Sequence, residues 1–416
     1  MNQSRAAVVS WCVYDWAMSS FSIIITTFIF AAYFTSHIAP NSLIGTHLWG
    51  NAASISGLCI AVLSPVFGAI ADHYRRRKIW LGCLSLIAVI GAALLWFAKP
   101  SSASIYFTLI CVVIGTVGLE IATVFYNSML PGLVAKKYIG RISGWAWGLG
   151  YAGGLICLII ALVFFVEGNV SWLDKTTAEN VRICGPLVSV WFFIFAIPLF
   201  IFWKEPEHIR ETIGSSLKRG LRELKHTIKT LPKQPDIFRY LIAHMIYVDG
   251  LNTIFAFGGI YAAGTFGMGI DEVIKFGIAM NVSAGFGAAL FAWVDDWIGP
   301  KKTIVISLTF AAIFSIILLI VHDKSLFWLF ALCLSLFFGP IQAASRSLMA
   351  HIVPPERETE LFGLYALSGR VTTFIGPWLL GTATLIFASQ RVGMATVLIF
   401  FVLGGILLCS VKAPQK

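Results

Sequence analysis

The sequence predicts an all-α polytopic membrane protein whose twelve transmembrane helices form two parallel-repeat six-helix bundles. Its mean hydropathy is +0.84. Only 12% of its 416 residues are charged, whereas a soluble domain carries about 25%. Apolar runs of about 20 residues recur along the chain, and each can cross roughly 30 Å of hydrocarbon. Two similar turns, at 68–78 and 292–302, each place an Asp before a basic cluster, which indicates a duplicated half.

Twelve apolar runs mark the predicted spans. A backbone inside lipid must satisfy its own hydrogen bonds, and these runs are long and lack period-two alternation, so we expect helices. The runs cover residues 8–36, 48–71, 79–98, 104–129, 142–166, 183–203, 237–263, 273–294, 303–321, 325–350, 361–388 and 392–411. The first run is too long for the apolar region of a cleavable signal peptide, and Asp15 interrupts it.

The net charge of +10 is interpreted as a topology signal. Most of the 30 Lys and Arg residues fall in segments that share one side, if both termini lie on that side. The positive-inside rule makes that side cytoplasmic. We therefore expect a multi-pass protein of the inner (plasma) membrane with both termini in the cytoplasm. The lipid bilayer is its expected surrounding, and no nucleic acid is expected as a partner.

The longest hydrophilic stretch separates six runs from the other six. We expect an N-terminal six-helix bundle at 1–203, a cytoplasmic basic amphipathic linker at 204–236 and a C-terminal six-helix bundle at 237–416. In the linker, Leu and Ile recur at helical spacing against Lys and Arg. Such a helix is typical of segments that lie on an anionic leaflet. A helix that binds a protein partner is the alternative.

A repeat relates the two halves of the chain. Asp72 and Asp296 lie 224 residues apart, and an offset of 219 carries Asn127 onto Arg346. Parallel six-helix repeats are typical of secondary transporters, whose substrate site lies near the bilayer midplane. Small-residue stripes such as Gly144–Gly148–Ala152 predict close helix packing, along faces that can slide during alternating access.

The two turns resemble a signature of the major facilitator superfamily. Its loop 2–3 motif is similar to Gly68, Asp72 and Arg76-Arg77-Lys78 of this chain. The repeat of that motif in loop 8–9 is similar to Asp296 with Lys301-Lys302. Arg75 stands where the signature usually carries Gly. The resemblance implies that helices 1, 4, 7 and 10 line a central cavity. It also implies that contacts at the turns hold the inward-closed arrangement. The expected gating residues are Asp72, Arg76, Asp296 and Lys301.

Four further motifs resemble the vacuole-effluxer-like branch of this superfamily. They are Tyr14–Ala17, Phe125–Pro131, Gly144–Gly154 and Tyr247–Gly250. The autophagy-linked fungal members of the branch release amino acids from the vacuole. The resemblance therefore implies a transporter of small solutes.

Three acids inside predicted spans are candidate site residues, because a charge in hydrocarbon costs about 2.5–3.5 kcal/mol on insertion scales. Asp15 begins a polar stripe on helix 1. Glu120 shares a stripe with Asn127 on helix 4, and Asp249 precedes Asn252 on helix 7. The acids fall on three of the four helices that the resemblance assigns to the cavity.

Helix 10 supplies the complementary charge. The offset of 219 carries the helix 4 stripe onto Gln342 and Arg346. Arg346 can hold a substrate carboxylate while Glu120 or Asp249 binds an ammonium group. Alternatively, Arg346 pairs internally with an acid or reaches the cytoplasmic face, and Arg370 likewise either binds substrate or pairs internally. The candidate substrate-binding or coupling set is Asp15, Glu120, Tyr126, Asn127, Asp249, Asn252, Gln342 and Arg346.

These observations predict a secondary active transporter that works by alternating access. A carboxylate in a dry cavity can change its protonation as access alternates. We therefore expect proton coupling through Glu120 or Asp249, with sodium coupling as the alternative. The expected partners are protons and a small zwitterionic solute such as an amino acid, and the protein is expected to work as a monomer. A drug or siderophore exporter of the same fold is the second hypothesis. A non-transporting receptor or lipid-moving protein is the third.

Enzymatic and metal chemistry lack the motifs that they need. No His-Glu-x-x-His or Gly-x-Ser-x-Gly pattern occurs, so we do not expect an enzyme. The eight Cys show no Cys-x-x-Cys spacing, which argues against a zinc site. We expect neither a metal nor another cofactor.

Overall fold

The structure is a computed structural model that describes residues 3–74, 77–168, 170–205, 222, 224–227 and 229–412; the side chains of residues 42, 70–74, 270 and 271 lie outside this description. The described residues form helices and turns, without a strand. Eleven of the described helices are long and apolar enough to cross a membrane. The remaining predicted span, 361–388, is divided between two shorter helices.

The first half of the chain supplies six membrane segments. The first segment joins four consecutive helical pieces, and the fifth ends in a π-helical turn. Their bounds are α1 (Arg5–Ser20), η1 (Phe21–Phe28), α2 (Ile29–Tyr33), η2 (Phe34–Ile38), α3 (Ser42–Tyr74), α4 (Arg77–Leu94), η3 (Leu95–Phe97), η4 (Ser102–Ser104), α5 (Ile105–Ser128), α6 (Leu130–Leu133), η5 (Lys136–Tyr138), α7 (Ile139–Ile160), η6 (Ala161–Val166), α8 (Glu179–Arg182) and α9 (Cys184–Phe202).

The second half supplies the other six segments. Their bounds are η7 (Leu231–Lys233), α11 (Pro235–Phe266), α12 (Ile270–Ile298), α13 (Pro300–Ile320), α14 (Lys324–Ser335), α15 (Phe338–Ile352), η8 (Pro355–Arg357), α16 (Glu358–Ser368), α17 (Ile375–Ile386) and α18 (Gln390–Cys409). Most of the predicted linker at 204–236 lies outside the described residues, which keep only part of its amphipathic pattern, such as the buried Leu224 and the exposed Lys225.

Two of the predicted spans in the second half are interrupted. The tenth span divides into α14 and α15, four residues before Pro340. The eleventh divides into α16 and α17 across residues 369–374, just before Pro377. A proline cannot donate the helical hydrogen bond to the residue four positions earlier, and its ring crowds that carbonyl. Both interruptions therefore have a local cause in the sequence.

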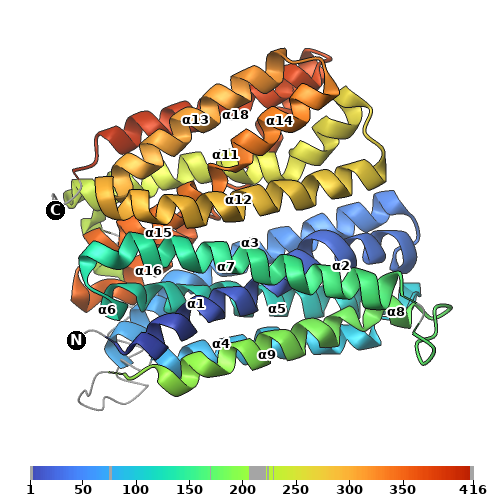
Figure 1. Cartoon of the computed structure of the whole chain (residues 1–416). Helices are drawn as coiled ribbons and strands as arrows, with labels where there is room; N and C mark the ends of the chain where they lie inside the picture. The colour runs from blue at the N-terminus through green and yellow to red at the C-terminus, as the bar shows by residue number, and fades with distance from the viewer. Residues whose placement is uncertain are drawn as a thin grey trace.

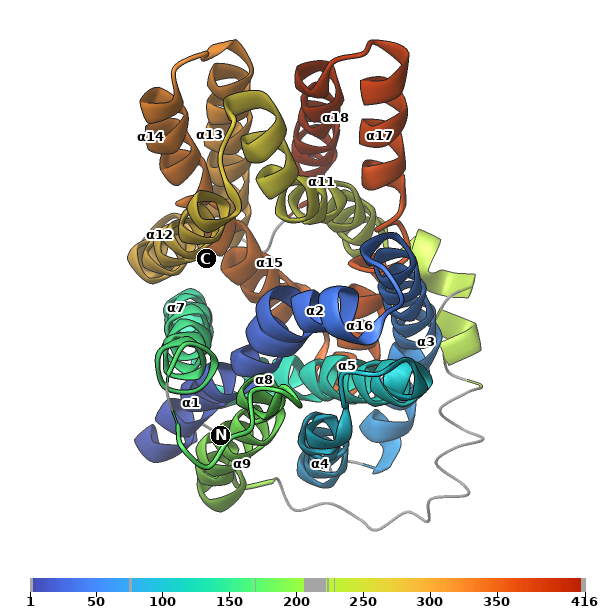
Figure 2. The ribbon, with the colours of Figure 1, turned by 90° about the vertical axis from the view of Figure 1, so that its right-hand side faces the viewer.

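The first six segments pack mainly against one another, and so do the last six. The two groups meet along two flanks. On one flank α7 packs against α12, and on the other α3 packs against α16 (Figure 2). Between the flanks, α15 crosses toward α7, and α16 also contacts α5. We call these groups the N-terminal bundle (α1–α9) and the C-terminal bundle (α11–α18).

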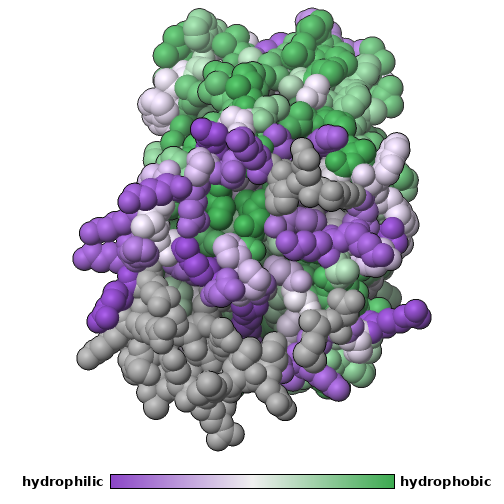
Figure 3. Space-filling model, turned by 90° about the vertical axis from the view of Figure 1, so that its left-hand side faces the viewer, coloured by the Kyte–Doolittle hydropathy of each residue, from purple (hydrophilic) through white to green (hydrophobic). Residues whose placement is uncertain are grey.

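Both ends of the chain lie at the same end of the molecule, which we call the terminal face (Figure 1). Hydrophilic side chains gather on the terminal face, and hydrophobic ones cover much of its rim (Figure 3). Large apolar side chains such as Leu385, Ile386 and Phe374 are strongly exposed. Exposed apolar surface of this kind is expected on helices that face lipid.

Each bundle caps its sixth segment with the same kind of residue. The Lys78 Nζ atom lies 3.4 Å from the Trp203 carbonyl at the end of α9. Lys301 donates to the Cys409 and Val411 carbonyls at the end of α18, at 2.8 and 2.6 Å. A cation stabilises a helix C-terminus by about 0.3–1 kcal/mol. One lysine of each basic cluster thus contacts the end of a helix in its own bundle.

Candidate functional site at the bundle interface

Arg346 is a buried cation that joins the two bundles. It lies on α15, and its side chain is 3% exposed. One of its guanidinium nitrogens donates to Asp15 Oδ2 of α1 at 2.9 Å and to Asn127 Oδ1 of α5 at 3.3 Å. Its other two nitrogens donate to the Ser143 hydroxyl and carbonyl of α7 at 2.9 and 2.8 Å. All four acceptors belong to the N-terminal bundle.

Three aromatic rings of the N-terminal bundle surround the same guanidinium. Its carbon lies 4.9 Å from the ring centre of Trp11, and 5.6 Å from those of Tyr126 and Trp147. Tyr126 also donates from its hydroxyl to Asp15 Oδ2 at 3.0 Å. Cation–π contacts of about 0.5–2 kcal/mol each add to the ion pair. We call Asp15, Asn127, Ser143 and these three rings the Arg346 cage.

The ion pair of Asp15 and Arg346 holds the bundles together near the terminal face. Removing one partner of a buried pair costs about 3–5 kcal/mol, because the other charge stays buried without compensation. Ser143 extends the contact, since its hydroxyl donates to the Ala343 carbonyl at 2.7 Å. The sequence left open whether Arg346 holds a substrate carboxylate, pairs internally with an acid or reaches the cytoplasmic face. In this conformation it pairs internally with an acid.

Glu120 and Arg370 form a second charged pair between the bundles. Arg370, in the turn between α16 and α17, donates to Glu120 Oε1 of α5. Unlike the Arg346 pair, this one is partly open, with side-chain exposures of 38% for Arg370 and 26% for Glu120. Glu120 is thus paired with a residue that the sequence treated as ambiguous, and both charges remain accessible.

Asp249 lies inside the C-terminal bundle, where α11 meets the start of α17. Its Oδ2 atom accepts a hydrogen bond from the Gly376 backbone N–H at 3.1 Å. Its Oδ1 atom is buried without a hydrogen-bond partner among the described residues. A Cβ at Gly376 would overlap Thr253 Oγ1. Glycine therefore lets the backbone of α17 approach the Asp249 carboxyl group.

The remaining candidates have different surroundings. Gln342 of α15 accepts from the Tyr151 hydroxyl of α7 at 2.7 Å, so it also joins the bundles. Asn252 is half-buried on α11, and its side chain makes no hydrogen bond within the described part of the chain. His244 of α11 lies 2.8 Å from the Ser368 hydroxyl inside the C-terminal bundle.

Charged pairs close the terminal face on both flanks. On the α7–α12 flank, Asp296 accepts from the Arg141 backbone N–H at 2.9 Å and lies 3.1 Å from its guanidinium. On the α3–α16 flank, Arg77 donates to Glu358 at 2.6 Å and to the Ser128 carbonyl at 2.9 Å. Asp296 thus contacts the opposite bundle.

Of the other predicted gating residues, the structure describes the side chain of Lys301 alone. Lys301 binds the end of α18 within its own bundle. Arg76 and the side chain of Asp72 lie outside the described residues. The adjacent Arg77 is the described member of that cluster that reaches across to the other bundle.

Small residues allow the helices to cross closely on both flanks. A Cβ at Gly144 of α7 would lie 2.6 Å from the Ala292 side chain and 2.7 Å from the Ala288 carbonyl of α12. A Cβ at Gly363 of α16 would lie 2.6 Å from the Ser64 carbonyl of α3. These two glycines are related by the repeat offset of 219, so the halves use equivalent positions for equivalent contacts.

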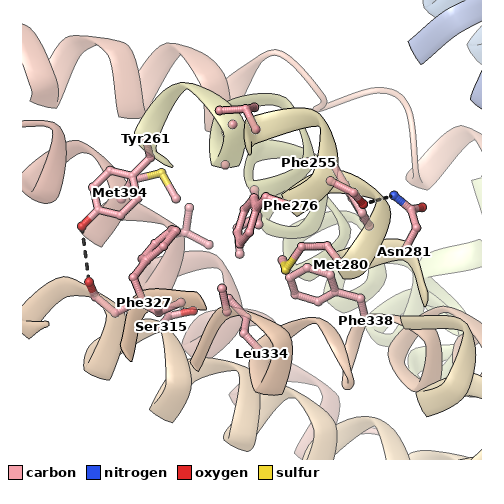
Figure 4. A pocket seen from close by; sticks show the side chains of 18 of the residues that line it. Phe255, Tyr261, Phe276, Met280, Asn281, Ser315, Phe327, Leu334, Phe338 and Met394 are labelled. Atoms are coloured by element: carbon pink, nitrogen blue, oxygen red, sulfur yellow. Dashed lines mark hydrogen bonds between the residues drawn. The ribbon is translucent and has the colours of Figure 1, made fainter. Parts of the chain in front are cut away.

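A cavity of about 350 Å³ lies mostly within the C-terminal bundle (Figure 4). Tyr261 and Phe276 place it toward the face opposite the termini, because they flank the turn between α11 and α12. Its labelled lining is rich in aromatic rings and sulfur, with Asn281 and Ser315 among the few polar groups (Figure 4). The N-terminal bundle contributes Ile23, Thr27 and Phe28, which belong to the π-helix η1 or its end.

Several interface residues escaped the sequence analysis. Ser143 and Trp147 contact Arg346, and Arg141 binds Asp296. Trp147 lies within the Gly144–Gly154 motif, so the motif was a usable signal. No local pattern distinguishes Ser143 from the many other serines in the spans.

Comparisons with known proteins agree on one family. A family model described as "Vacuole effluxer Atg22 like" matches residues 51–416. The chain is 26% identical to YxiO of Bacillus subtilis (strain 168), described as an uncharacterized MFS-type transporter, over 97% of this chain and 94% of that one. It is 21% identical to autophagy-related protein 22 of Saccharomyces cerevisiae, over 74% of this chain and 66% of that one.

Other fungal relatives are longer. Autophagy-related protein 22 of Cryptococcus neoformans is 22% identical over 63% of this chain, and the match spans 50% of the fungal protein. The chain thus covers about half of that relative.

Solved structures show the same fold. The proton:xylose symporter XylE, bound to 6-bromo-6-deoxy-D-glucose, has a TM-score of 0.77 at 12% identity, over 98% of this chain and 96% of that one. The transporter FucP in its outward conformation has a TM-score of 0.76 at 15% identity, over 98% and 99%. At these identities the likeness concerns the fold alone.

Proposed function

Because the chain belongs to the Atg22-like vacuole effluxer family and has the major facilitator fold of a secondary transporter, we propose that it moves a small zwitterionic solute, such as an amino acid, by proton-coupled alternating access. The inner (plasma) membrane, with the terminal face in the cytoplasm, is the proposed location. The protein is proposed to work as a monomer.

The partly open pair of Glu120 and Arg370 is the observation that carries the zwitterion proposal. The two charges come from different bundles, and both remain accessible. An ammonium group can replace Arg370 at Glu120, while a carboxylate replaces Glu120 at Arg370. This assignment differs from the sequence hypothesis, which gave the carboxylate to Arg346. In this conformation Arg346 is already bound by the N-terminal bundle.

Asp249 is the proposed proton carrier, with Glu120 as the other candidate. An acid with one buried oxygen free of hydrogen bonds suits the neutral, protonated form, because burying a carboxylate without partners is costly. Asp249 lies inside the C-terminal bundle, whereas the Glu120–Arg370 pair joins the two bundles, which allows proton and solute to occupy different sites.

The apolar cavity favours a second candidate function. Aromatic, aliphatic and Met side chains make up most of its lining (Figure 4). Such a lining suits a largely apolar solute, so export of a drug or siderophore is the alternative.

Transport by the purified protein in liposomes tests both proposals. An imposed pH gradient is combined with a pool of labelled amino acids, and uptake is compared with liposomes that lack a gradient. We expect gradient-driven accumulation of at least one amino acid. Movement of a dye or siderophore without movement of any amino acid would favour the alternative. Arg370→Gln is the variant that tests the site. If the Glu120–Arg370 pair binds the solute, this variant should lose gradient-driven accumulation.

A further inference from the structure

We propose that the Arg346 cage is a binding site for an organic cation, and that Arg346 fills it only while the terminal face is closed. The ligand class is a small solute with an ammonium or guanidinium group. The proposal rests on the alternating access of the proposed function. It adds the Arg346 cage as a second site for a cationic group, beside Glu120, which the proposed function gives to the ammonium group.

The division of contacts between the bundles is the first support. Each acceptor and ring that surrounds the guanidinium lies on the N-terminal bundle, whereas Arg346 itself lies on α15 of the C-terminal bundle. If the bundles separate at the terminal face, Arg346 must leave with α15. The cage then stays behind as a set of groups that still favours a cation.

The chemistry of the cage is the second support. Asp15 supplies a negative charge at 2.9 Å, and three aromatic rings present faces to the guanidinium. Aromatic rings with a carboxylate bind organic cations, which are more weakly hydrated than metal ions. The Ser143 hydroxyl and carbonyl accept two further N–H bonds. This arrangement suits a planar guanidinium best and an ammonium group next.

The cage is held in shape without Arg346. Trp11 donates from its ring nitrogen to the Tyr126 carbonyl at 3.0 Å, and the Tyr126 hydroxyl lies 3.0 Å from the Trp11 carbonyl. The two rings also stack, with centres 4.3 Å apart. Contacts within one bundle therefore fix the site before any cation enters.

The consequence is a competition between the protein and its ligand. A cation that enters from the terminal face takes the place of Arg346 and so favours the open state. When the ligand leaves, Arg346 can return and the face can close. In the closed state Arg346 thus occupies the site that a cationic group of a solute can take.

A binding measurement on the purified full-length protein tests the proposal. In Arg346→Ala, methylguanidinium should bind saturably, with a change in tryptophan fluorescence and a raised Tm. Wild-type protein should bind it at least tenfold more weakly. Arg346→Ala combined with Asp15→Asn should lose at least tenfold in affinity. The matched control is Arg182→Ala, which removes a buried arginine that lies over the Trp96 ring outside the cage, and this variant should bind no better than wild type.

Methylammonium and sodium chloride serve as further probes. Binding of methylguanidinium alone assigns guanidinium solutes, and binding of both organic cations extends the assignment to ammonium solutes. An equal response to sodium would overturn the proposal, as would a folded Arg346→Ala protein that binds neither organic cation. If Arg346→Ala does not fold, Arg346→Gln keeps a long polar side chain and replaces it under the same criteria. The assay needs no gradient and no transport, so its failure and that of the liposome assay are distinguishable.

Discussion

Asp249 allows the proton-coupling hypothesis to be tested at a single residue. Asn keeps the size of the side chain and can still accept from the Gly376 N–H, but it cannot carry a proton. In Asp249→Asn we expect at least a tenfold loss of gradient-driven accumulation, while exchange of labelled for unlabelled solute continues. Liposome uptake with and without a pH gradient measures both.

Asp174 offers the control for this substitution. It lies in the loop before α8, and hydrogen bonds from Thr176 hold its pKa below the usual value. It therefore stays ionised near neutral pH and takes up no proton there. Asp174→Asn should leave accumulation unchanged. If accumulation survives in both Asp249→Asn and Glu120→Gln, neither acid carries the proton.

At the residue scale, the sequence singled out charged residues that the structure brings together, but it did not name their partners. Asp15, Asn127 and Arg346 were all candidates, and the structure brings them together. Asp15 and Arg346 are 331 residues apart, so their pairing depends on how the bundles meet. The repeat held the one usable hint, because Asn127 and Arg346 occupy equivalent positions and touch across the interface. No local sequence pattern predicted that Arg370 pairs with Glu120.

At the scale of elements, the crossing of α7 and α12 depends on having no side chain at Gly144. Alanine there would meet the backbone carbonyl of Ala288, which cannot rotate away. Overpacking typically costs about 1–3 kcal/mol. We therefore expect Gly144→Ala to shift the equilibrium away from the closed terminal face by about five- to hundredfold. Distances between spin labels at the exposed positions Lys137 and Trp297 report the shift.

Gly57→Ala on α3 is the control for that change, because a Cβ there meets nothing within 4 Å. Alanine favours a helix over glycine by roughly 0.5–1 kcal/mol in both variants. An unchanged label distance in Gly144→Ala would show that α7 and α12 can accommodate the added methyl group while the terminal face stays closed.

The elements themselves were largely predictable, and their interruptions were less so. Length and hydropathy placed the spans, because a membrane leaves few alternatives to helices. The breaks before Pro340 and Pro377 have a local signal in the prolines, which the sequence analysis did not use. The π-helix η1 has no such signal, since Phe21–Phe28 reads as an ordinary apolar run. Its residues Ile23 and Thr27 line the cavity, whose other walls come mostly from the C-terminal bundle. The π-helical shape therefore depends on how the two bundles pack.

At the scale of the whole molecule, the two flanks should open together if each bundle moves as a rigid body. Arg77–Glu358 closes one flank and Arg141–Asp296 the other. Glu358→Arg replaces an attraction by a repulsion. An exposed ion pair is worth about 0–1 kcal/mol, but this pair is partly buried, with side-chain exposures of 21% for Arg77 and 13% for Glu358. Losing it and adding a repulsion should therefore shift the equilibrium toward the open terminal face by at least about fivefold.

The informative measurement is made on the flank that is not mutated. Labels at Lys137 and Trp297 lie beside the α7–α12 crossing, away from Glu358, yet their distance should lengthen in Glu358→Arg. The double variant Arg77→Glu with Glu358→Arg should restore it, because the pair is re-formed with reversed charges. Lys301→Gln should leave it unchanged, since Lys301 binds only its own bundle among its described contacts. A change confined to the α3–α16 flank would mean that the bundles bend. The buried Asp15–Arg346 pair between the flanks would then have to open separately from them.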